Sequence, residues 1–398
     1  MFNKIFKKDE LKFLWPFYLS NFLLGLSLII LPFLVIYFKN MGFSLYQISL
    51  FTSAMAIGVL LFEIPTGAFA DNYSRKKSIV LGFFIYGILL LGIAFITDFY
   101  VLLCFWFLSG LAVTFISGAD DALVIDNLSH LKREDLKKEF FIKVQALRGF
   151  GMIISPFIGA YVVKNYSMSL VWVISGISII LVGAIFTFMK EYYVPKRKSF
   201  VKSVMDSYKT SSKGLKFIIN NKKLLILIAA GLFFSLMSAA NNGWQPLLVE
   251  FSLPEYSLGI VYSILGIFTI ISSIISRYLT TKIKILLPIF IVMKMILAFG
   301  LLLVTPPEFL GVVMIFIVYT GMLDAITMPS LSVYFHKISK KKIRATLVSI
   351  KSMVSAFVIA IFSIFAGLLM DNIGITRTII LSSLFGIIAI FFFLRVKD

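Results

Sequence analysis

The chain has 398 residues, of which 60% are hydrophobic and 14% are charged, and its formal net charge is +19. This composition excludes an ordinary soluble domain, because too few polar side chains are present to cover a surface in water. A nucleic-acid partner is not expected either, since the Lys and Arg of a membrane protein collect in its cytoplasmic loops. The single cysteine, Cys104, rules out an intramolecular disulfide.

Twelve apolar stretches follow one another along the chain, and each is long enough to cross a hydrocarbon layer about 30 Å thick as a helix. Backbone polar groups must be paired inside lipid, and continuous apolar runs do not fit the alternating strands of a barrel. The predicted fold class is therefore an all-α membrane protein with twelve transmembrane helices. The stretches lie near 13–38, 46–70, 78–97, 100–125, 144–163, 169–189, 224–249, 258–280, 285–304, 309–335, 346–369 and 375–394.

Basic residues divide unevenly between the two sides of this layer. Of the 38 Lys and Arg, 30 lie on the side of the N-terminus and 3 on the other side, and the rest lie inside or at the edge of helices. This asymmetry predicts that both termini are cytoplasmic. The N-terminal segment MFNKIFKKDELKF leads into a full-length span without a small-residue cleavage site, so no signal peptide is expected.

The connection between the second and third stretches reads GAFADNYSRKKS, residues 67–78. It is similar to the loop signature of the major facilitator superfamily, roughly Gly-x-x-x-Asp-Arg-x-Gly-Arg followed by Arg or Lys. Asn72 and Ser74 stand where the family has a base and a glycine. The resemblance implies a transporter built from two pseudo-symmetric six-helix bundles. The matching positions are Gly67, Asp71, Arg75 and Lys76.

Physical reasons support a special role for this loop. A glycine at 67 lets a neighbouring helix approach closely. Asp71 at a helix end can pair with a base or accept hydrogen bonds from another helix's first amides. Asp126, at the cytoplasmic end of the fourth helix, is a natural partner for Arg75. In the family this cluster is understood as a latch between conformations. The resemblance therefore implies a latch that consists of Gly67, Asp71, Arg75, Lys76 and Asp126. The alternative is a solvated basic loop.

A second string, GMIISPFIGA at 151–160, resembles the fifth-helix motif of the family's proton-driven drug exporters. Gly151, Pro156 and Gly159 match, and Ser155 and Ala160 replace glycines with other small residues. Proline bends the helix and small residues permit tight packing, so an ordinary kinked helix is the alternative. This resemblance favours export over uptake.

The longest charged connection predicts three parts of the chain. An N-terminal six-helix bundle is expected over 1–189, a cytoplasmic linker with an amphipathic helix over 190–223, and a C-terminal six-helix bundle over 224–398. The halves echo each other, since SGADDA at 117–122 matches TGMLDA at 320–325. Parallel repeats of this kind fit the architecture that the resemblance implies.

Charged side chains within apolar stretches are functional candidates, because a mid-bilayer charge is costly unless it is paired or hydrated. Glu63 lies well inside the second stretch and is a candidate for proton coupling or cation recognition; a structural acid is the alternative. Lys294 is expected to be structural, either snorkelling or reaching Asp324.

Two pseudo-equivalent acid–base pairs are also predicted. Asp120 and Asp121 are adjacent, so on a helix they point about 100° apart. Asp121 and Arg148 lie at similar depths, which predicts one pair, and the repeat predicts the second between Asp324 and Lys351. The pairs either tie helices together or break when a proton or cation arrives.

Uncharged polar residues mark the expected substrate cavity. They lie in the first and seventh helices, which line the cavity in the family, and amides and an indole suit a bulky, partly apolar ligand. These residues are Asn21, Asn241, Asn242, Trp244 and Gln245.

The predicted function is a secondary active transporter working by alternating access, with proton-coupled efflux of a lipophilic or cationic compound of the multidrug or tetracycline type. The alternative is proton-coupled uptake of a small nutrient, or a lipid-like flippase. Enzyme chemistry is not expected, because the histidines His130 and His336 lie at helix ends and the one cysteine is alone. No nucleotide-binding loop occurs, so ATP-driven pumping is not expected either. We expect no metal, no cofactor other than protons as coupling ions, a monomer, and a multi-pass location in the plasma membrane.

Overall fold

The computed structural model is helical throughout its described part, which confirms the all-α class. It describes the chain except residues 1–5, 193–198, 280–282, 328–330, 332–334, 336–343 and 396–398. Within that part, 12 helical segments are long and apolar enough to cross a membrane. Helices satisfy every backbone group within the segment, which is what a lipid environment demands.

Contacts between Cα atoms group the chain into two compact units. The first consists of Met1–Leu31 and Ile57–Ser207, and the second of Pro32–Ala56 and Tyr208–Asp398. Residues 32–56 therefore pack with segments from the second half of the sequence. The division into 1–189, 190–223 and 224–398 stays a prediction.

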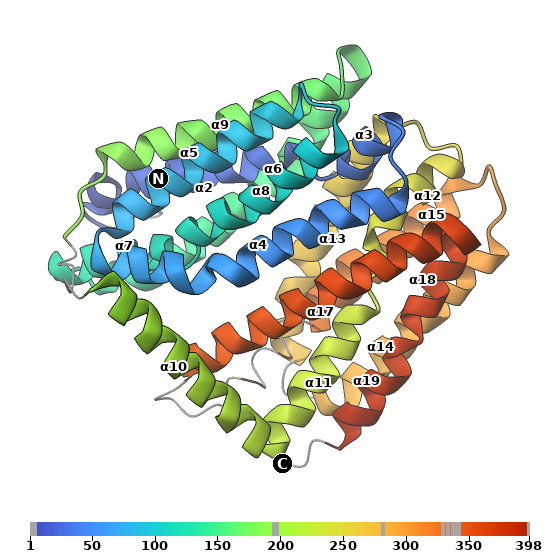
Figure 1. The fold of residues 1–398 in the computed structure, drawn as a ribbon. Helices are drawn as coiled ribbons and strands as arrows, with labels where there is room; N and C mark the ends of the chain where they lie inside the picture. Colours follow the sequence, from blue (N-terminus) through green and yellow to red (C-terminus); the bar gives the residue numbers. More distant parts are fainter. Residues whose placement is uncertain are drawn as a thin grey trace. The chain divides into compact units, whose positions relative to one another are not determined.

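The first unit is built on three neighbouring pairs of helices: α5 packs against α9 and α6, and α2 packs against α8 (Figure 1). Its elements are α2 (Glu10–Ser27), η1 (Leu28–Ile30), the later part of α4 (Leu45–Asn72), α5 (Arg75–Ile93), α6 (Phe99–Ile116), α7 (Ala119–His130), α8 (Asp135–Asn165), α9 (Ser169–Phe188) and the start of α10 (Phe200–Asn220).

The second unit packs α11 against α19 and α17, and α14 against α18 and α19. Its elements are α3 (Leu34–Asn40), the first part of α4, the rest of α10, α11 (Lys222–Leu236), η2 (Asn241–Gly243), α12 (Trp244–Glu250), α13 (Ser257–Leu279), α14 (Ile283–Gly300), η4 (Leu301–Leu303), α15 (Phe309–Phe316), η5 (Ile317–Met322), α17 (Arg344–Ile373), α18 (Ile375–Ser383) and α19 (Phe385–Leu394).

Aromatic rings fill the core of the first unit. Phe17 lies between Phe140 and Phe186, with ring centroids 5.9 and 5.8 Å away in edge-to-face arrangements. Edge-to-face contact is favourable because the positive edge of one ring meets the negative face of the next. Many other large apolar side chains point outward; Phe188, for example, is 84% exposed. Outward apolar surface of this kind suits contact with lipid.

Two glycines allow α2 and α8 to cross at backbone contact. A Cβ added at Gly151 would lie 2.4 Å from the Cα of Gly25, and one added at Gly25 would lie 2.9 Å from the Cα of Gly151. Real side chains do not approach backbone so closely. The glycine that begins the GMIISPFIGA string is therefore required by packing.

Several spans are interrupted at their polar residues. The fourth span breaks at Gly118, whose φ of +72° separates α6 from α7 just before Asp120. The seventh passes through the 3-10 turn η2, and the tenth contains the π-helix η5, which ends two residues before Asp324. Irregular backbone at membrane depth is tolerated only where protein or a water-lined cavity surrounds it, so these breaks point to the functional region of each unit.

Candidate functional site

Arg148 of α8 is the centre of a polar cluster in the first unit. Its Nε donates a hydrogen bond to Oδ1 of Asn21 at 2.6 Å, and its guanidinium lies 3.8 Å from Oδ2 of Asp120. Asn21 is 6% exposed and also donates to the carbonyl of Phe17, so its orientation is fixed. The cluster thus joins three helices through one guanidinium whose contact with the acid is long.

The acid paired with Arg148 is Asp120, not Asp121, so the predicted Asp121–Arg148 pair is wrong. The reason is the helix break at Gly118: the helix restarts at Ala119, which changes the register that a continuous helix would have. Asp121 is exposed, and its backbone N–H donates to Oδ1 of Asp120 at 2.8 Å.

Glu63 of α4 belongs to the same unit, and its carboxyl group interacts with the side chain of Ser117. Ser117 is the residue between α6 and Gly118, so the carboxyl contacts the break itself. Two of the predicted acids are therefore close to the break at Gly118. Glu63 interacts with the residue before it, and Asp120 lies two residues after it.

The predicted latch residues gather around Arg75 at the start of α5. Its side chain forms an ion pair with Asp126 of α7, as the sequence indicates, and lies 3.5 Å from Asp71. Asp71 is 58% exposed. Within the first unit, no described atom of another helix lies within 4 Å of a Cβ added at Gly67, so the close helix approach expected at this glycine stays a prediction.

Glu191, which follows α9, completes this cluster. It was not identified as a candidate residue from the sequence. Its carboxylate accepts hydrogen bonds from the backbone N–H of Arg75 at 2.7 Å and of Lys76 at 3.2 Å, and from the hydroxyl of Ser74 at 2.5 Å. A carboxylate at the first amides of a helix satisfies unpaired donors and interacts favourably with the positive end of the helix dipole. No local pattern links position 191 to position 75, so only the fold reveals the contact.

Lys294 of α14 is the most enclosed charge described in the second unit, with 0% side-chain exposure. Its ammonium lies 2.6 Å from Oδ1 of Asp324 and 3.3 Å from the hydroxyl of Ser238. It also lies over the rings of Tyr319 and Phe234, 4.1 and 5.1 Å from their centroids. An ammonium enclosed by a carboxylate and two aromatic faces is well compensated.

This arrangement replaces the predicted Asp324–Lys351 pair, which is wrong. Asp324 is bound to Lys294, whereas the ammonium of Lys351 lies 5.1 Å from the centroid of Phe335. The expectation that Lys294 reaches Asp324 is confirmed. Asp324 keeps 23% side-chain exposure, so the carboxylate is the less enclosed member of the pair.

The predicted cavity residues of the seventh span have different surroundings. Asn241 is exposed and Asn242 is half-buried. Trp244 is 1% exposed and packs on the rings of Phe316 and Tyr319. It is therefore a core residue of the second unit in this structure.

Gln245 stabilises the start of α3, where the helix of the first span is interrupted. Its side-chain oxygen accepts from the backbone N–H of Val35 at 3.1 Å, and its amide donates to the hydroxyl of Tyr262 at 2.8 Å. Val35 lies in the first turn of α3, where a helix leaves its amides unpaired.

A second buried acid, Glu10, was not singled out from the sequence. It is 0% exposed and accepts hydrogen bonds from Tyr18 at 2.6 Å and from Lys143 of α8 at 2.5 Å. Lys143 in turn lies over the ring of Phe6. The cluster ties the start of α2 to α8.

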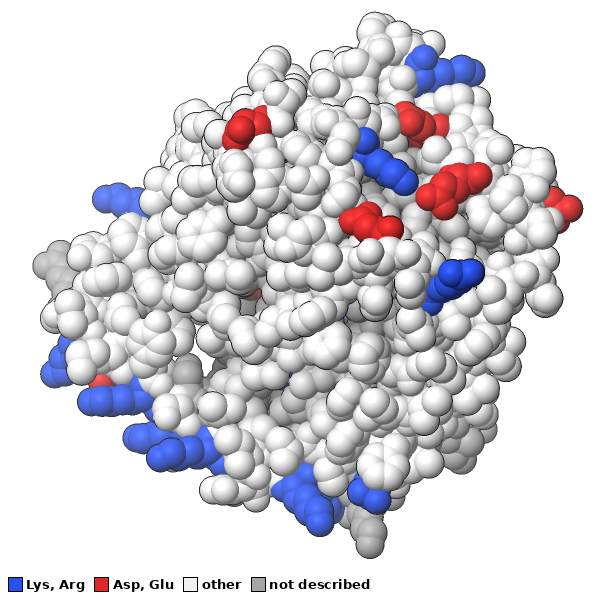
Figure 2. Space-filling view, turned by 45° about the vertical axis from the view of Figure 1, so that its right-hand side comes forward, with Lys and Arg blue, Asp and Glu red and all other residues white. Residues whose placement is uncertain are grey.

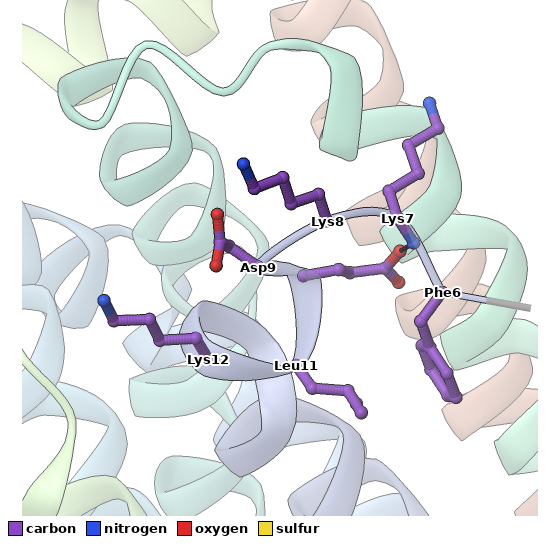
Figure 3. A pocket seen from close by; sticks show the side chains of 7 residues that line it. Phe6, Lys7, Lys8, Asp9, Leu11 and Lys12 are labelled. Atoms are coloured by element: carbon purple, nitrogen blue, oxygen red, sulfur yellow. Dashed lines mark hydrogen bonds between the residues drawn. The ribbon is translucent and has the colours of Figure 1, made fainter. Parts of the chain in front are cut away.

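A cavity of about 580 Å³ lies beside this segment and is lined by residues 6–12. Figure 3 shows Lys8, Asp9 and Lys12 pointing to one side of the segment, and Phe6 and Leu11 to the other. The lining contains none of the predicted substrate residues. Nearby, outside the spans, a hydrogen bond to Asp135 raises the pKa of Arg133.

One face of the described surface is mostly uncharged (Figure 2). Figure 2 shows one face of the molecule, with a broad area free of Lys, Arg, Asp and Glu across its middle. Among the described residues, no group of three or more His, Cys, Asp or Glu is arranged to hold a metal ion.

The sequence matches the family described as the Major Facilitator Superfamily over residues 17–350. The chain belongs to this superfamily. It is accordingly a multi-pass membrane transporter and not an enzyme, as the loop signature and the twelve spans predict.

Relatives support the same class. The uncharacterized MFS-type transporter YxaM of Bacillus subtilis is 25% identical over 404 residues and 96% of each chain. The multi-drug resistance efflux pump PmrA of Streptococcus pneumoniae is 29% identical over 198 residues, which are 48% of this chain and 47% of that protein. The fold is shared with nucleoside transporter NupG (TM-score 0.74, 17% identity, 95% and 96% coverage) and with a D-xylose–proton symporter (TM-score 0.71, 13% identity, 97% and 98% coverage).

Proposed function

We propose that this transporter exports a lipophilic or cationic compound in exchange for protons. The observation that carries the proposal is the charge balance around Gly118 in the first unit. Glu63, Asp120 and Asp121 are three carboxyl groups, and Arg148 is the base that pairs with Asp120. A surplus of acid within membrane helices favours binding of a proton or a cation. The likeness to PmrA over half of the chain supports export.

The geometry suggests how a proton and a cation would compete. The contact between Asp120 and Arg148 is long, at 3.8 Å, whereas the hydrogen bond between Arg148 and Asn21 is short, at 2.6 Å. A proton on Asp120 cancels its attraction for Arg148 without removing the bond to Asn21. A cation needs the ionised carboxylate, so proton and cation exclude each other. Binding that differs between two conformations is what coupling requires.

We also propose alternating access in the plasma membrane by a monomer with both termini cytoplasmic. The Arg75–Asp126 pair and the Glu191 contacts to Arg75 and Lys76 would stabilise one of the two conformations. The 30-to-3 division of basic residues supports the orientation.

Accumulation of ethidium in cells with and without the protein tests the proposal, with and without a protonophore. We expect reduced accumulation that the protonophore abolishes. Asp120→Asn and Glu63→Gln should each lose export at equal expression, whereas Glu308→Gln, an exposed acid outside the spans, should retain it. Equal accumulation with and without the protein would contradict export of this compound class.

One observation favours a second candidate, proton-coupled uptake of a small polar nutrient. The amides of Asn241 and Asn242 are exposed and half-buried, and amides suit hydroxyl-rich ligands. Uptake of a radiolabelled nucleoside and a pentose separates the candidates: accumulation that depends on the proton gradient and is lost in Asn241→Ala would favour uptake over export.

A further inference from the structure

Helix α10 of the linker carries an apolar stripe that its own contacts leave exposed. Successive residues turn by 100° around a helix, which places the stripe within an arc of about 80°. Its side chains are 44–65% exposed, although they are large and apolar. We call this the exposed stripe, and it consists of Val201, Met205, Tyr208, Leu215 and Ile219.

Lysines border the exposed stripe. They occupy the adjoining arc of about 60° around the helix, and all of them are exposed. One acid, Asp206, lies beyond them. The basic residues are Lys202, Lys209, Lys213 and Lys216.

The remaining side of α10 faces the protein. The hydroxyl of Ser203 donates to Oδ1 of Asn72 at 3.1 Å, and the ring of Phe200 lies 6.5 Å from that of Tyr73. Ile218, near the other end, is 3% exposed and belongs to the core of the second unit. The exposed stripe is therefore not the packing side of the helix.

Both ends of α10 lead to membrane spans, and a single residue, Asn221, separates its C-terminal end from the next span. The span Ser169–Phe188 precedes it and the span Lys222–Glu250 follows it at once. The helix has 21 residues and so extends about 32 Å, which uses most of the linker. The connection through Asn221 keeps the C-terminal end of α10 at the membrane surface, on the side of the membrane where most Lys and Arg lie.

We propose that α10 lies in the headgroup region of the cytoplasmic leaflet. The exposed stripe enters the boundary between headgroups and acyl chains, and the bordering lysines bind anionic phospholipid headgroups. Amphipathic helices with a basic polar face bind membranes in this way, and the anionic lipids of the cytoplasmic leaflet attract basic segments near it. The ammonium groups reach the phosphates while their methylene stems cover apolar surface.

Depth-dependent fluorescence quenching tests the proposal in the full-length protein. Cys104 is replaced by Ser, and single cysteines are introduced as Met205→Cys and Ile219→Cys in the exposed stripe, with Lys202→Cys and Lys213→Cys as matched controls. Each variant is labelled with a polarity-sensitive dye and reconstituted in vesicles that contain acyl-chain quencher lipids. One vesicle set is phosphatidylcholine alone, and the other also contains phosphatidylglycerol.

We expect blue-shifted emission and strong quenching at positions 205 and 219, and little of either at positions 202 and 213. Phosphatidylglycerol should increase the quenching, and high salt should reverse that increase because it screens the lysines. Equal signals at all four positions overturn the proposal, as does quenching that depends on protein density, which indicates contact between copies. Quenching that is identical in both vesicle sets overturns the role of the lysines. The measurement needs no transport, so its outcome is independent of the proposed export.

Discussion

Lys294 and Asp324 form a buried pair whose two members are enclosed to different degrees. The ammonium has no exposed surface, whereas the carboxylate keeps 23% exposure. Breaking a buried ion pair costs most when the partner left behind has no access to water. The two single substitutions at this pair should therefore have unequal effects.

Asp324→Asn is predicted to destabilise the protein by about 3–5 kcal/mol, because Lys294 must remain charged without its partner or give up its proton. Lys294→Met should cost less, since the remaining carboxylate is less enclosed than the ammonium. Thermal unfolding in detergent measures both changes. The double variant Lys294→Met/Asp324→Asn should be more stable than Asp324→Asn alone. Equal losses in the two single variants would contradict this reading of the pair.

The membrane charges show how far residue-level prediction reaches. The sequence identified Asp120, Arg148 and Asp324 as polar groups within spans, because charges in apolar runs are conspicuous. It assigned the wrong partners, since equal depth along two helices does not determine which side chains face each other. Gly118 interrupts the helix of the fourth span just before Asp120, and Asp324 pairs with Lys294 of α14 and not with Lys351.

At the scale of elements, the crossing of α2 and α8 depends on two glycines that meet at backbone contact. Gly151→Ala would place a Cβ 2.4 Å from the Cα of Gly25, so the helices must separate or bend. We predict a loss of about 1–3 kcal/mol, as for other overpacked sites, measured by thermal unfolding. Gly67→Ala is the matched control within the first unit and should be neutral or slightly stabilising, because a Cβ there meets open space and alanine favours helix. A loss as large at Gly67 would contradict the packing argument.

The start of α5 is held by a residue from beyond the end of α9. Glu191→Ala removes the acceptor for two backbone amides and should cost about 0.5–2 kcal/mol. Hydrogen exchange should quicken at the amides of Arg75 and Lys76. Asp98→Ala, which removes the cap that Asp98 gives to the N–H of Val101 in α6, is the comparison and should quicken exchange there instead. Unchanged exchange at Arg75 and Lys76 in Glu191→Ala would show that the cap is dispensable.

Elements were predicted better than their interruptions. Each of the twelve apolar stretches overlaps a span of the structure, because apolar length alone determines a transmembrane helix. The π-helix η5 and the turn η2 have no such signal, since apolar and small residues fit regular and irregular turns alike. Contacts such as that of Glu191 with Arg75 join positions 116 apart in sequence and follow only from packing.

At the scale of the whole molecule, the grouping of residues 32–56 with the second unit has specific contacts behind it. Asp371 at the end of α17 accepts from the backbone N–H of Leu45 at 3.0 Å and of Tyr46 at 2.8 Å, and so caps α4. Along the same two helices, the hydroxyl of Ser53 donates to the carbonyl of Ala360. The alternating access that we propose requires spans from the two halves of the sequence to separate on one side in each cycle. The contact between the first part of α4 and α17 is therefore expected to open during transport.

Ser49 and Gly367 allow this expectation to be tested, because a Cβ at Gly367 would lie 2.9 Å from that of Ser49. Cβ atoms joined by a disulfide are about 3.5–4.5 Å apart. The added Cβ would also lie 2.9 Å from the backbone carbonyl oxygen of Leu45, so α4 and α17 must separate locally before the bond forms. In a Cys104→Ser background, Ser49→Cys/Gly367→Cys should transport when reduced, stop when oxidised, and recover with a reductant, whereas Gly367→Cys alone should not respond to oxidant. Asp371→Ala, which removes the cap on α4, should weaken the closed contact and slow disulfide formation. Full transport by the cross-linked protein would show that α4 and α17 stay together throughout the cycle, and that the movement takes place elsewhere.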